Sequence, residues 1–315
     1  MKFKHNPVLT SQIMKIADKI PPGGTIVDCT LGGGGHLELL VENANKPSLI
    51  IGIDRDLDAI AWNKNRNWPC PSHFIHSPFS KFRQIMNQLS LGEVYFVLAD
   101  FGVSSHQLDT AHRGFSFSKD GPLDMRMDQK QKLTLADKFK SVDYQELKFI
   151  LKKYGEEKEA ARIAKALLHD FQTGKIKTTN ELAQIVRRVK KQKQPGLNAA
   201  TKTFQALRIW VNEELIEIEK LLETVPEFLA PGGIFAAITF HSLEDRLVKN
   251  CFTQLAHPEN DIPSGIPLTK SQLPQSLYLT KGPIKPEQSE IKENPRSRSA
   301  KLRYLQRKEE KANEQ

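Results

Sequence analysis

The sequence predicts an α/β protein in which a doubly wound, mostly parallel sheet is interrupted by an all-helical insertion. Short apolar runs end in Asp28, Asp54 and Asp100, and amphipathic stretches separate them, which is typical of buried parallel strands alternating with helices. From about residue 111 to 207 helical periodicity replaces this pattern, and a strand-like run returns near residue 232. We therefore expect a sheet domain in two parts, 1–108 and 209–315, around a helical domain at 109–208.

Length and composition limit the possible classes of protein. The chain has 315 residues, 39% hydrophobic and 26% charged, which suits two domains or one domain with a large insertion. Lys and Arg outnumber Asp and Glu by 46 to 37, giving a formal net charge of +9, and this excess favours a polyanionic partner. The N-terminus lacks the apolar core of a signal peptide, and no run approaches the ~20 apolar residues that span a bilayer. We expect a cytoplasmic protein with no membrane partner.

The three cysteines do not indicate a disulfide framework or a metal site. They are few and scattered, and no Cys-x-x-Cys pair exists. Cys70 lies close to His73 and His76, but these histidines would point to opposite faces of a strand, which is poor geometry for a shared zinc ion. We expect no metal.

The strand-like runs cover residues 25–28, 49–54 and 94–100, and residues 56–62 read as a helix between two of them. Because the carboxyl ends of parallel strands meet at one edge of a sheet, the three terminal aspartates should gather around one crevice. Further along, residues 144–151 and 160–168 have helical spacing, 213–222 are helix-like and 232–240 are strand-like. Residues 257–275 read as an exposed loop, and 308–311 as a frayed end.

A glycine run follows the first strand. Four glycines, 32 to 35, stand between Asp28 and His36, where they permit positive φ and let a ligand approach backbone N–H groups at a helix N-terminus. The dinucleotide fingerprint G-x-G-x-x-G is not met, because its third glycine position is Leu37. The remaining pattern, D-x-x-x-G-x-G, resembles the first motif of S-adenosylmethionine-dependent methyltransferases. The alternative is a flexible turn without a ligand.

Two of the strand-end acids have specific candidate roles. Asp54 lies 19 residues after Gly35, where a carboxylate accepts both hydroxyls of a ribose, from either NAD or S-adenosylmethionine; the alternative is a helix N-cap. Asp100 could hold the exocyclic amine of a nucleobase in line with a donor methyl group. A serine–histidine pair from Ser104, Ser105 and His106 would be the alternative, but the G-x-S-x-G elbow is absent.

Long, ordered strings extend over nearly the whole chain. They are HNPVL at 5–9, the glycine run, DFGVSS with QLD at 100–109, RGFSF at 113–117, GPLDMRMD at 121–128, YGEE at 154–157, FQALRIWVNEEL at 204–215, FHSLEDR at 240–246 and NPRSRSAKLR at 294–303. Together they resemble the bacterial 16S ribosomal RNA cytosine-N4 methyltransferases, with a Rossmann-like fold. Two departures are Phe101, where the family usually has Leu, and Asn198-Ala199, where it usually has His-Pro.

The resemblance implies an enzyme that methylates the N4 amine of a cytosine in the decoding region, within an assembled or nearly assembled small subunit. Asp100, at the third strand end, is the catalytic residue that we expect. The cofactor contacts for S-adenosylmethionine that the resemblance implies are Gly34, Gly35, His36, Asp54, Phe79, Asp100 and Gln107. Without the family, Phe79 could equally be a core phenylalanine and His36 a solvent-facing residue at a helix start. The sequence is compatible with either a monomer or a homodimer.

Candidate RNA contacts come from basic residues and one histidine. Between residues 187 and 208 there are seven basic residues and no Asp or Glu, which suits a phosphate backbone or a solvated helix face. The expected contacts are Arg187, Arg188, Lys190, Lys191 and Lys193, with the basic residues 296–303 as a second wall. His241 could line the cytosine pocket, while Ser242 fits the N-cap of a capping box.

Two rival functions remain on the residues alone. A nicotinamide-dependent oxidoreductase is opposed by the missing third glycine, and a non-catalytic RNA-binding assembly factor would not need Asp54 and Asp100.

Overall fold

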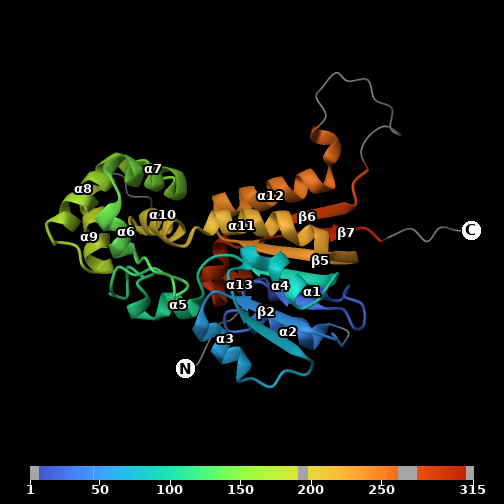
Figure 1. The fold of residues 1–315 in the computed structure, drawn as a ribbon. Coiled ribbons are helices and arrows are strands. Elements are labelled where there is room, and N and C mark those ends of the chain that lie inside the picture. Colours follow the sequence, from blue (N-terminus) through green and yellow to red (C-terminus); the bar gives the residue numbers. More distant parts are fainter. Residues whose placement is uncertain (1–6, 45, 191–197, 262–274, 310–315) are drawn as a thin grey trace, which may run out of the picture. The chain divides into compact units, whose positions relative to one another are not determined.

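The structure, a computed structural model, describes residues 7–44, 46–190, 198–261 and 275–309 (Figure 1). The described chain forms two compact units. The helical unit holds residues 103–215, and the sheet unit holds the described residues before 103 and after 215. The helical unit thus begins six residues before the predicted insertion at 109–208 and ends seven residues after it.

The described residues of the sheet unit form a seven-stranded sheet in the order β3-β2-β1-β4-β5-β7-β6. Strands β1 to β5 are parallel, whereas β7 runs antiparallel to β5 and β6 antiparallel to β7. The predicted α/β class is confirmed. The bounds are β1 (Ile26–Asp28), β2 (Ile50–Asp54), β3 (Ser72–His76), β4 (Val94–Asp100), β5 (Leu229–Thr239), β6 (Tyr278–Ile284) and β7 (Lys301–Arg307).

Helices cover both faces of this sheet. Phe96 and Leu98 of β4 pack in one core with residues of the first two helices, such as Ile13. On the other face, the ring of Phe235 in β5 lies 5.4 Å from that of Phe252. The bounds are α1 (Thr10–Ala17), α2 (Gly35–Asn43), α3 (Leu57–Lys64), η1 (Phe79–Lys81), α4 (Phe82–Gln88), α11 (Glu214–Thr224, whose first two residues belong to the helical unit), η3 (Val225–Phe228), α12 (Ser242–Ala256), η4 (Pro258–Asp261), α13 (Gln288–Glu293) and η6 (Pro295–Ser299).

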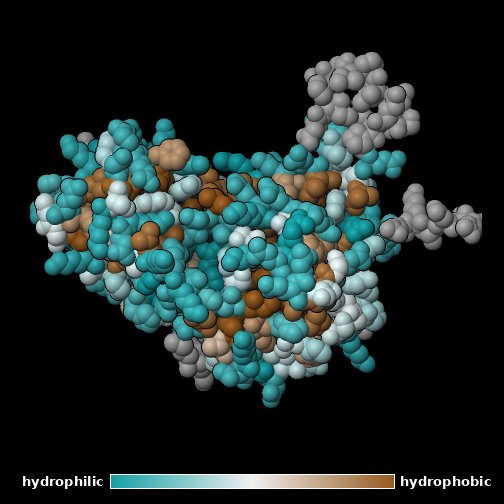
Figure 2. All heavy atoms as spheres, in the orientation of Figure 1, coloured by the Kyte–Doolittle hydropathy of each residue, from teal (hydrophilic) through white to brown (hydrophobic). Residues whose placement is uncertain are grey.

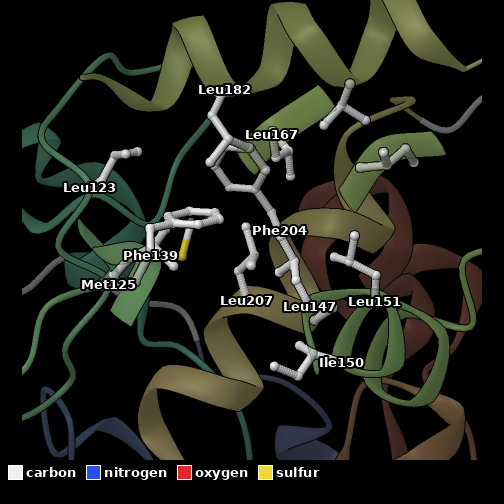
Figure 3. Packing of buried hydrophobic residues seen from close by; sticks show 14 of the residues in the cluster. Leu123, Met125, Phe139, Leu147, Ile150, Leu151, Leu167, Leu182, Phe204 and Leu207 are labelled. Atoms are coloured by element: carbon white, nitrogen blue, oxygen red, sulfur yellow. The ribbon is translucent and has the colours of Figure 1, made fainter. Parts of the chain in front are cut away.

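The helical unit has a core of its own. Phe139, Leu182 and Phe204 converge from three helices (Figure 3), and side chains cap several helix starts, as Thr178 does by accepting from the backbone N–H of Glu181. The bounds are α5 (Ser105–Asp109), η2 (Ala111–Arg113), α6 (Leu135–Ser141), α7 (Tyr144–Gly155), α8 (Ala160–Gln172), α9 (Thr179–Val189) and α10 (Thr201–Asn212).

None of the helices in the described ranges has both the length and the apolar character that a membrane crossing requires. Of the predicted loop at 257–275, residues 262–274 lie outside the described part of the chain, and residues 310 and 311 of the predicted frayed end do so too.

Candidate functional site

The carboxyl ends of three parallel strands meet at one edge of the sheet. Asp28, at the end of β1, is level with Gly52 of β2 and Leu98 of β4. Asp54 and Asp100 therefore lie two residues further along their own strands, on either side of the shorter β1. The strand order reverses here, because β1 is hydrogen-bonded to both β2 and β4. Open α/β sheets bind their ligands at such a switch point.

A glycine loop joins β1 to α2 at this edge. Gly34 is the N-cap of α2 with φ +77°, a left-handed conformation that glycine adopts without strain. A Cβ atom at Gly34 would lie only 2.2 Å from Oδ1 of Asn63, so the position also lacks space for a side chain. The first turn of α2, which starts at Gly35, thus presents backbone N–H groups beside the strand ends.

Two side chains from the region of α3 hold the glycine loop, and the sequence analysis missed both. Asn63 donates from Nδ2 to the carbonyls of Gly32 at 2.9 Å and Ala59 at 2.8 Å. Arg66 donates from Nη1 to the carbonyl of Gly33 at 3.1 Å. A signal for Asn63 was present, because this polar residue follows Ala59 by four positions and so extends the apolar face of the helix predicted at 56–62.

Asp54 accepts two backbone hydrogen bonds. Gly32 N–H donates to Oδ2 at 2.7 Å and Asp56 N–H to Oδ1 at 2.8 Å. Burial nevertheless raises the pKa of Asp54 to about 6. The alternative that Asp54 is an N-cap is wrong, since Asp56 caps α3. Each carboxylate oxygen of Asp54 still has acceptor capacity for a further donor, such as a ribose hydroxyl.

Aromatic side chains lie beyond the carboxyl ends of β3 and β4. Phe79 begins η1 and is half-buried. Its ring centroid lies 5.8 Å from that of the buried Phe101. The guanidinium of Arg55 lies 5.7 Å from the Phe79 centroid and pairs with Glu217 at 3.2 Å. Phe79 is therefore not a fully buried core residue, and its ring can pack against a planar ligand.

His36 and Asp100 face each other near the glycine loop. Nε2 of His36 lies 2.8 Å from the carbonyl of Val8 and must donate there, because a carbonyl only accepts. Nδ1 of His36 lies 3.7 Å from Oδ2 of Asp100. His36 is 6% exposed, so the alternative of a solvent-facing histidine is wrong. Oδ1 of Asp100 is buried and has no hydrogen-bond partner in the described structure.

The acids at this edge have raised pKa values. Burial raises the pKa of Asp28 to about 7, with the Asp54 charge adding to the effect. Burial raises the pKa of Asp100 well above its usual range, and the charges of Asp28 and Glu244 raise it further. Thr30 connects two of these acids, since its N–H donates to Asp28 at 3.0 Å and its hydroxyl oxygen accepts from Asp100 N–H at 2.6 Å. A ligand with positive charge would favour the ionised acids, so this edge suits a cation.

His241 lies two residues past the end of β5 and is the N-cap of α12. Its Nδ1 accepts from Glu244 N–H at 3.3 Å, while Oε2 of Glu244 accepts from the N–H groups of Phe240 and His241 at 2.8 and 3.2 Å. The predicted N-cap at Ser242 is therefore wrong. The cap is His241, one residue earlier, and its capping partner is Glu244 instead of Asp245.

Comparison with known proteins adds to this geometry. The sequence model of the MraW methylase family matches residues 2–308. The chain belongs to this family. It is therefore a methyltransferase, and S-adenosylmethionine is its cofactor.

This MraW methylase is similar in sequence to a curated relative and, only weakly, in fold to two solved structures. "Ribosomal RNA small subunit methyltransferase H" of Clostridioides difficile (strain 630) is 40% identical over 312 residues, 98% of this chain and 100% of that protein. A candidate rRNA-methylase from Clostridium thermocellum has a TM-score of 0.43 and 11% identity, covering 96% of this chain and 99% of its own. An rRNA methylase from Streptococcus thermophilus has a TM-score of 0.39 and 9% identity, covering 96% and 98%. Both structural likenesses are too weak to carry an argument.

The residues at the strand edge of this MraW methylase fit S-adenosylmethionine. Asp54 has acceptor capacity for ribose hydroxyls, and the half-buried ring of Phe79 can pack on adenine. Backbone N–H groups at Gly35 and His36 lie at a helix start, where a carboxylate is bound favourably. The raised pKa values of the acids suit the positive charge of the sulfonium, and the unpartnered oxygen of Asp100 is an acceptor for a ligand.

Gln107, the last expected cofactor contact, lies in the helical unit of the methylase. It closes a capping box at the start of α5, in which Ser104 Oγ accepts from Gln107 N–H at 3.2 Å and Gln107 Oε1 accepts from Ser104 N–H at 3.1 Å. Ser104 therefore serves as a helix cap, which does not support a nucleophilic role beside His106. The cofactor role of Gln107 stays a prediction.

The structure describes all three residues weighed as zinc ligands: His73 and His76 lie on β3, and Cys70, a free cysteine, precedes that strand. His76 Nε2 lies 2.9 Å from the carbonyl of Arg55, and His73 is exposed. Within the described ranges, no group of three or more His, Cys, Asp or Glu residues could hold a metal ion.

Two of the predicted RNA contacts form ion pairs within the helical unit. Arg188 Nη2 lies 2.6 Å from Asp170, and Lys190 Nζ lies 2.9 Å from Glu157. The Lys190 and Glu157 side chains are only 10% and 2% exposed, so the prediction that Lys190 meets phosphate does not agree with the structure. Arg188 is 66% exposed and can still reach an anion, although its charge is partly neutralised.

The other predicted RNA contacts differ in whether their charges are free to bind phosphate. Arg187 is exposed and forms no ion pair within the described residues. Lys191 and Lys193 lie outside the described residues. In the C-terminal basic segment, Lys301 and Arg303 both lie 2.8 Å from one carboxylate at the start of α12, so these two charges are also partly neutralised.

Proposed function

We propose that this chain transfers the methyl group of S-adenosylmethionine to the N4 amine of a cytosine in the decoding region of 16S ribosomal RNA. The observation that carries the proposal is Asp100, a strand-end carboxylate with one buried oxygen that has no hydrogen-bond partner in the described structure. The substrate class is supported by the 40% identical relative, whose name specifies small-subunit ribosomal RNA.

The target amine is a poor nucleophile, because its lone pair is delocalised into the ring. When bound, S-adenosylmethionine supplies a methyl group on positively charged sulfur. Asp100 Oδ1 accepts an N–H of the amine and orients the lone pair toward that methyl group. The raised pKa of Asp100 makes it a stronger base for the proton that the amine loses. His36, with its own proton on Nε2, faces the second Asp100 oxygen through Nδ1.

The physical substrate in this proposal is an assembled or nearly assembled small subunit in the cytoplasm. The target cytosine must be unpaired or flipped out, since the N4 amine of a paired cytosine is engaged in a base pair. His241 is a candidate to line the cytosine pocket, because it follows β5 at the same edge of the sheet as Asp100.

The test is to incubate unmodified small subunits with the enzyme and isotope-labelled S-adenosylmethionine. The rRNA is then digested to nucleosides and analysed by mass spectrometry. We expect the label in N4-methylcytidine at a single position. Label in 5-methylcytidine or in another methylated nucleoside would contradict the cytosine-N4 assignment, and no labelled rRNA at all would contradict the substrate.

A further inference from the structure

Helix α7 presents an exposed aromatic ring on the face opposite the core. Leu147, Ile150 and Leu151 of this helix point into the core of the helical unit (Figure 3). Phe149 falls on the opposite side of the helix and is 56% exposed. In Figure 2, hydrophobic atoms are visible among hydrophilic ones over α7. A single exposed phenylalanine is common on protein surfaces, so only the residues around it can indicate a binding site.

Lysines surround this ring. Lys152 and Lys153 follow Phe149 by three and four positions and therefore flank it on the same face. Lys153 Nζ lies 5.3 Å from the Phe149 centroid, and Lys148 Nζ lies 5.9 Å from the ring of Tyr144, which is 37% exposed. None of the three lysines forms an ion pair within the residues that the structure describes. These five residues are here called the α7 surface.

This surface differs from the basic run at the end of α9. There, Arg188 and Lys190 are bound to carboxylates of their own unit, whereas the α7 lysines form no ion pair within the described residues. Lys152 and Lys153 also stabilise α7, because positive charges interact favourably with the C-terminal end of a helix dipole. That stabilisation does not require an aromatic ring beside the lysines. Lysine ammonium groups beside an exposed aromatic ring suit a nucleic acid strand, because its phosphates can bind the lysines while its bases stack on the ring.

We propose that the α7 surface binds a single-stranded segment of the RNA substrate, with a base stacked on Phe149 and phosphates contacted by Lys152 and Lys153. This inference rests on the proposed function. A single strand is favoured over a duplex, because base faces are available for stacking only where the bases are unpaired. A protein partner is disfavoured, because lysine is depleted in protein interfaces.

The first test measures the charge contribution. A fluorescent single-stranded pyrimidine 12-mer RNA is titrated with the full chain over a series of salt concentrations, and binding is followed by anisotropy. Lys152→Gln/Lys153→Gln should lower the slope of log affinity against log salt by up to about 1.4, or about 0.7 for each lost phosphate contact. The matched control is Lys165→Gln/Lys175→Gln, which removes the same charge from exposed residues elsewhere in the helical unit. Equal slopes for the two double variants would overturn the proposal.

The second test isolates stacking. Phe149→Leu keeps an apolar side chain but removes the ring, and its exposure means that the fold should not depend on it. We expect binding of the single strand to weaken at least fivefold, given about 1–3 kcal/mol for one stacked base, while binding of a duplex 12-mer stays the same. Leu133→Ala, at another exposed apolar residue, is the control. Unchanged single-strand binding by Phe149→Leu would overturn the stacking.

Methylation of small subunits separates this inference from the function on which it rests. If the wild type does not methylate them, the proposed function fails. If it does, and the α7 variants show an unchanged KM for the subunit, only the α7 inference fails. A raised KM for the subunit, with unchanged binding of the RNA 12-mer, would indicate a protein partner and would also overturn the RNA assignment. Cofactor affinity should be equal in all variants.

Discussion

Protonation of Asp54 should weaken cofactor binding in mildly acidic solution. Its pKa is raised to about 6, so below that pH the carboxyl is neutral and no longer favours the cationic cofactor or accepts fully from ribose. We expect S-adenosylmethionine affinity to fall as pH drops below about 6, approaching tenfold for each pH unit for one proton. Calorimetric titration from pH 5 to 8 measures this dependence.

Asp54→Asn is the matching variant, because it keeps the shape of the side chain and one acceptor oxygen. We expect it to weaken binding at pH 8 by at least ~1.5 kcal/mol, the scale of charge-assisted hydrogen bonds, and to flatten the decline below pH 6. Asp28 has a pKa of about 7 and should leave a residual pH dependence. Wild-type affinity in the variant would remove Asp54 from the cofactor site.

At the scale of elements, the glycine loop depends on α3 as much as on its own glycines. Gly34→Ala places a Cβ 2.2 Å from Asn63 Oδ1 in a left-handed conformation, so the loop must shift and the hydrogen bond from Asn63 to Gly32 must break or lengthen. We expect cofactor affinity to fall more than tenfold, while the secondary structure seen by circular dichroism is retained. Gly92→Ala is the control, since no atom lies within 4 Å of its added Cβ. Equal cofactor affinity in both variants would show that the loop is not tightly held.

The strands show which elements could be predicted from sequence. Strand β4 was predicted with its observed bounds, because a continuous apolar run of seven residues ending in an acid is typical of a buried parallel strand. Strand β7 was interpreted only as part of a basic segment. Leu302, Tyr304 and Leu305 are buried. The charged residues Lys301, Arg303 and Arg307 stand among them and hid this short apolar pattern.

The residues of the candidate site could be predicted only where their position follows from a local sequence pattern. Asp28, Asp54 and Asp100 could be brought together because strand ends share one edge. The contact of His36 with Val8 spans 28 residues, and no periodicity relates them. The same limit applies to the ion pair of Lys190 with Glu157, 33 residues away, which is why the basic run looked freely available in the sequence.

For the whole molecule, the net charge of +9 overstates the positive charge that can bind RNA, because some basic side chains form ion pairs within the fold. Lys190→Gln leaves the nearly buried Glu157 without its ion pair, so we expect a loss of stability on the order of 3 kcal/mol. Arg187→Gln, at an exposed residue, should change stability by less than ~0.5 kcal/mol. Chemical denaturation of both variants measures the difference. Equal stability would mean that the Lys190 charge is free for another partner after all.

The central claim is that Asp54 binds the cofactor whereas Asp100 acts on the target amine. Single-turnover methyl transfer to small subunits at saturating S-adenosylmethionine, with wild type, Asp54→Asn and Asp100→Asn compared in parallel, tests it most directly. We expect Asp54→Asn to recover a rate near that of the wild type once cofactor saturates, and Asp100→Asn to stay at least ~100-fold slower at any cofactor concentration. An Asp100→Asn enzyme that excess cofactor restores to the wild-type rate would contradict the claim, because Asp100 would then serve binding alone.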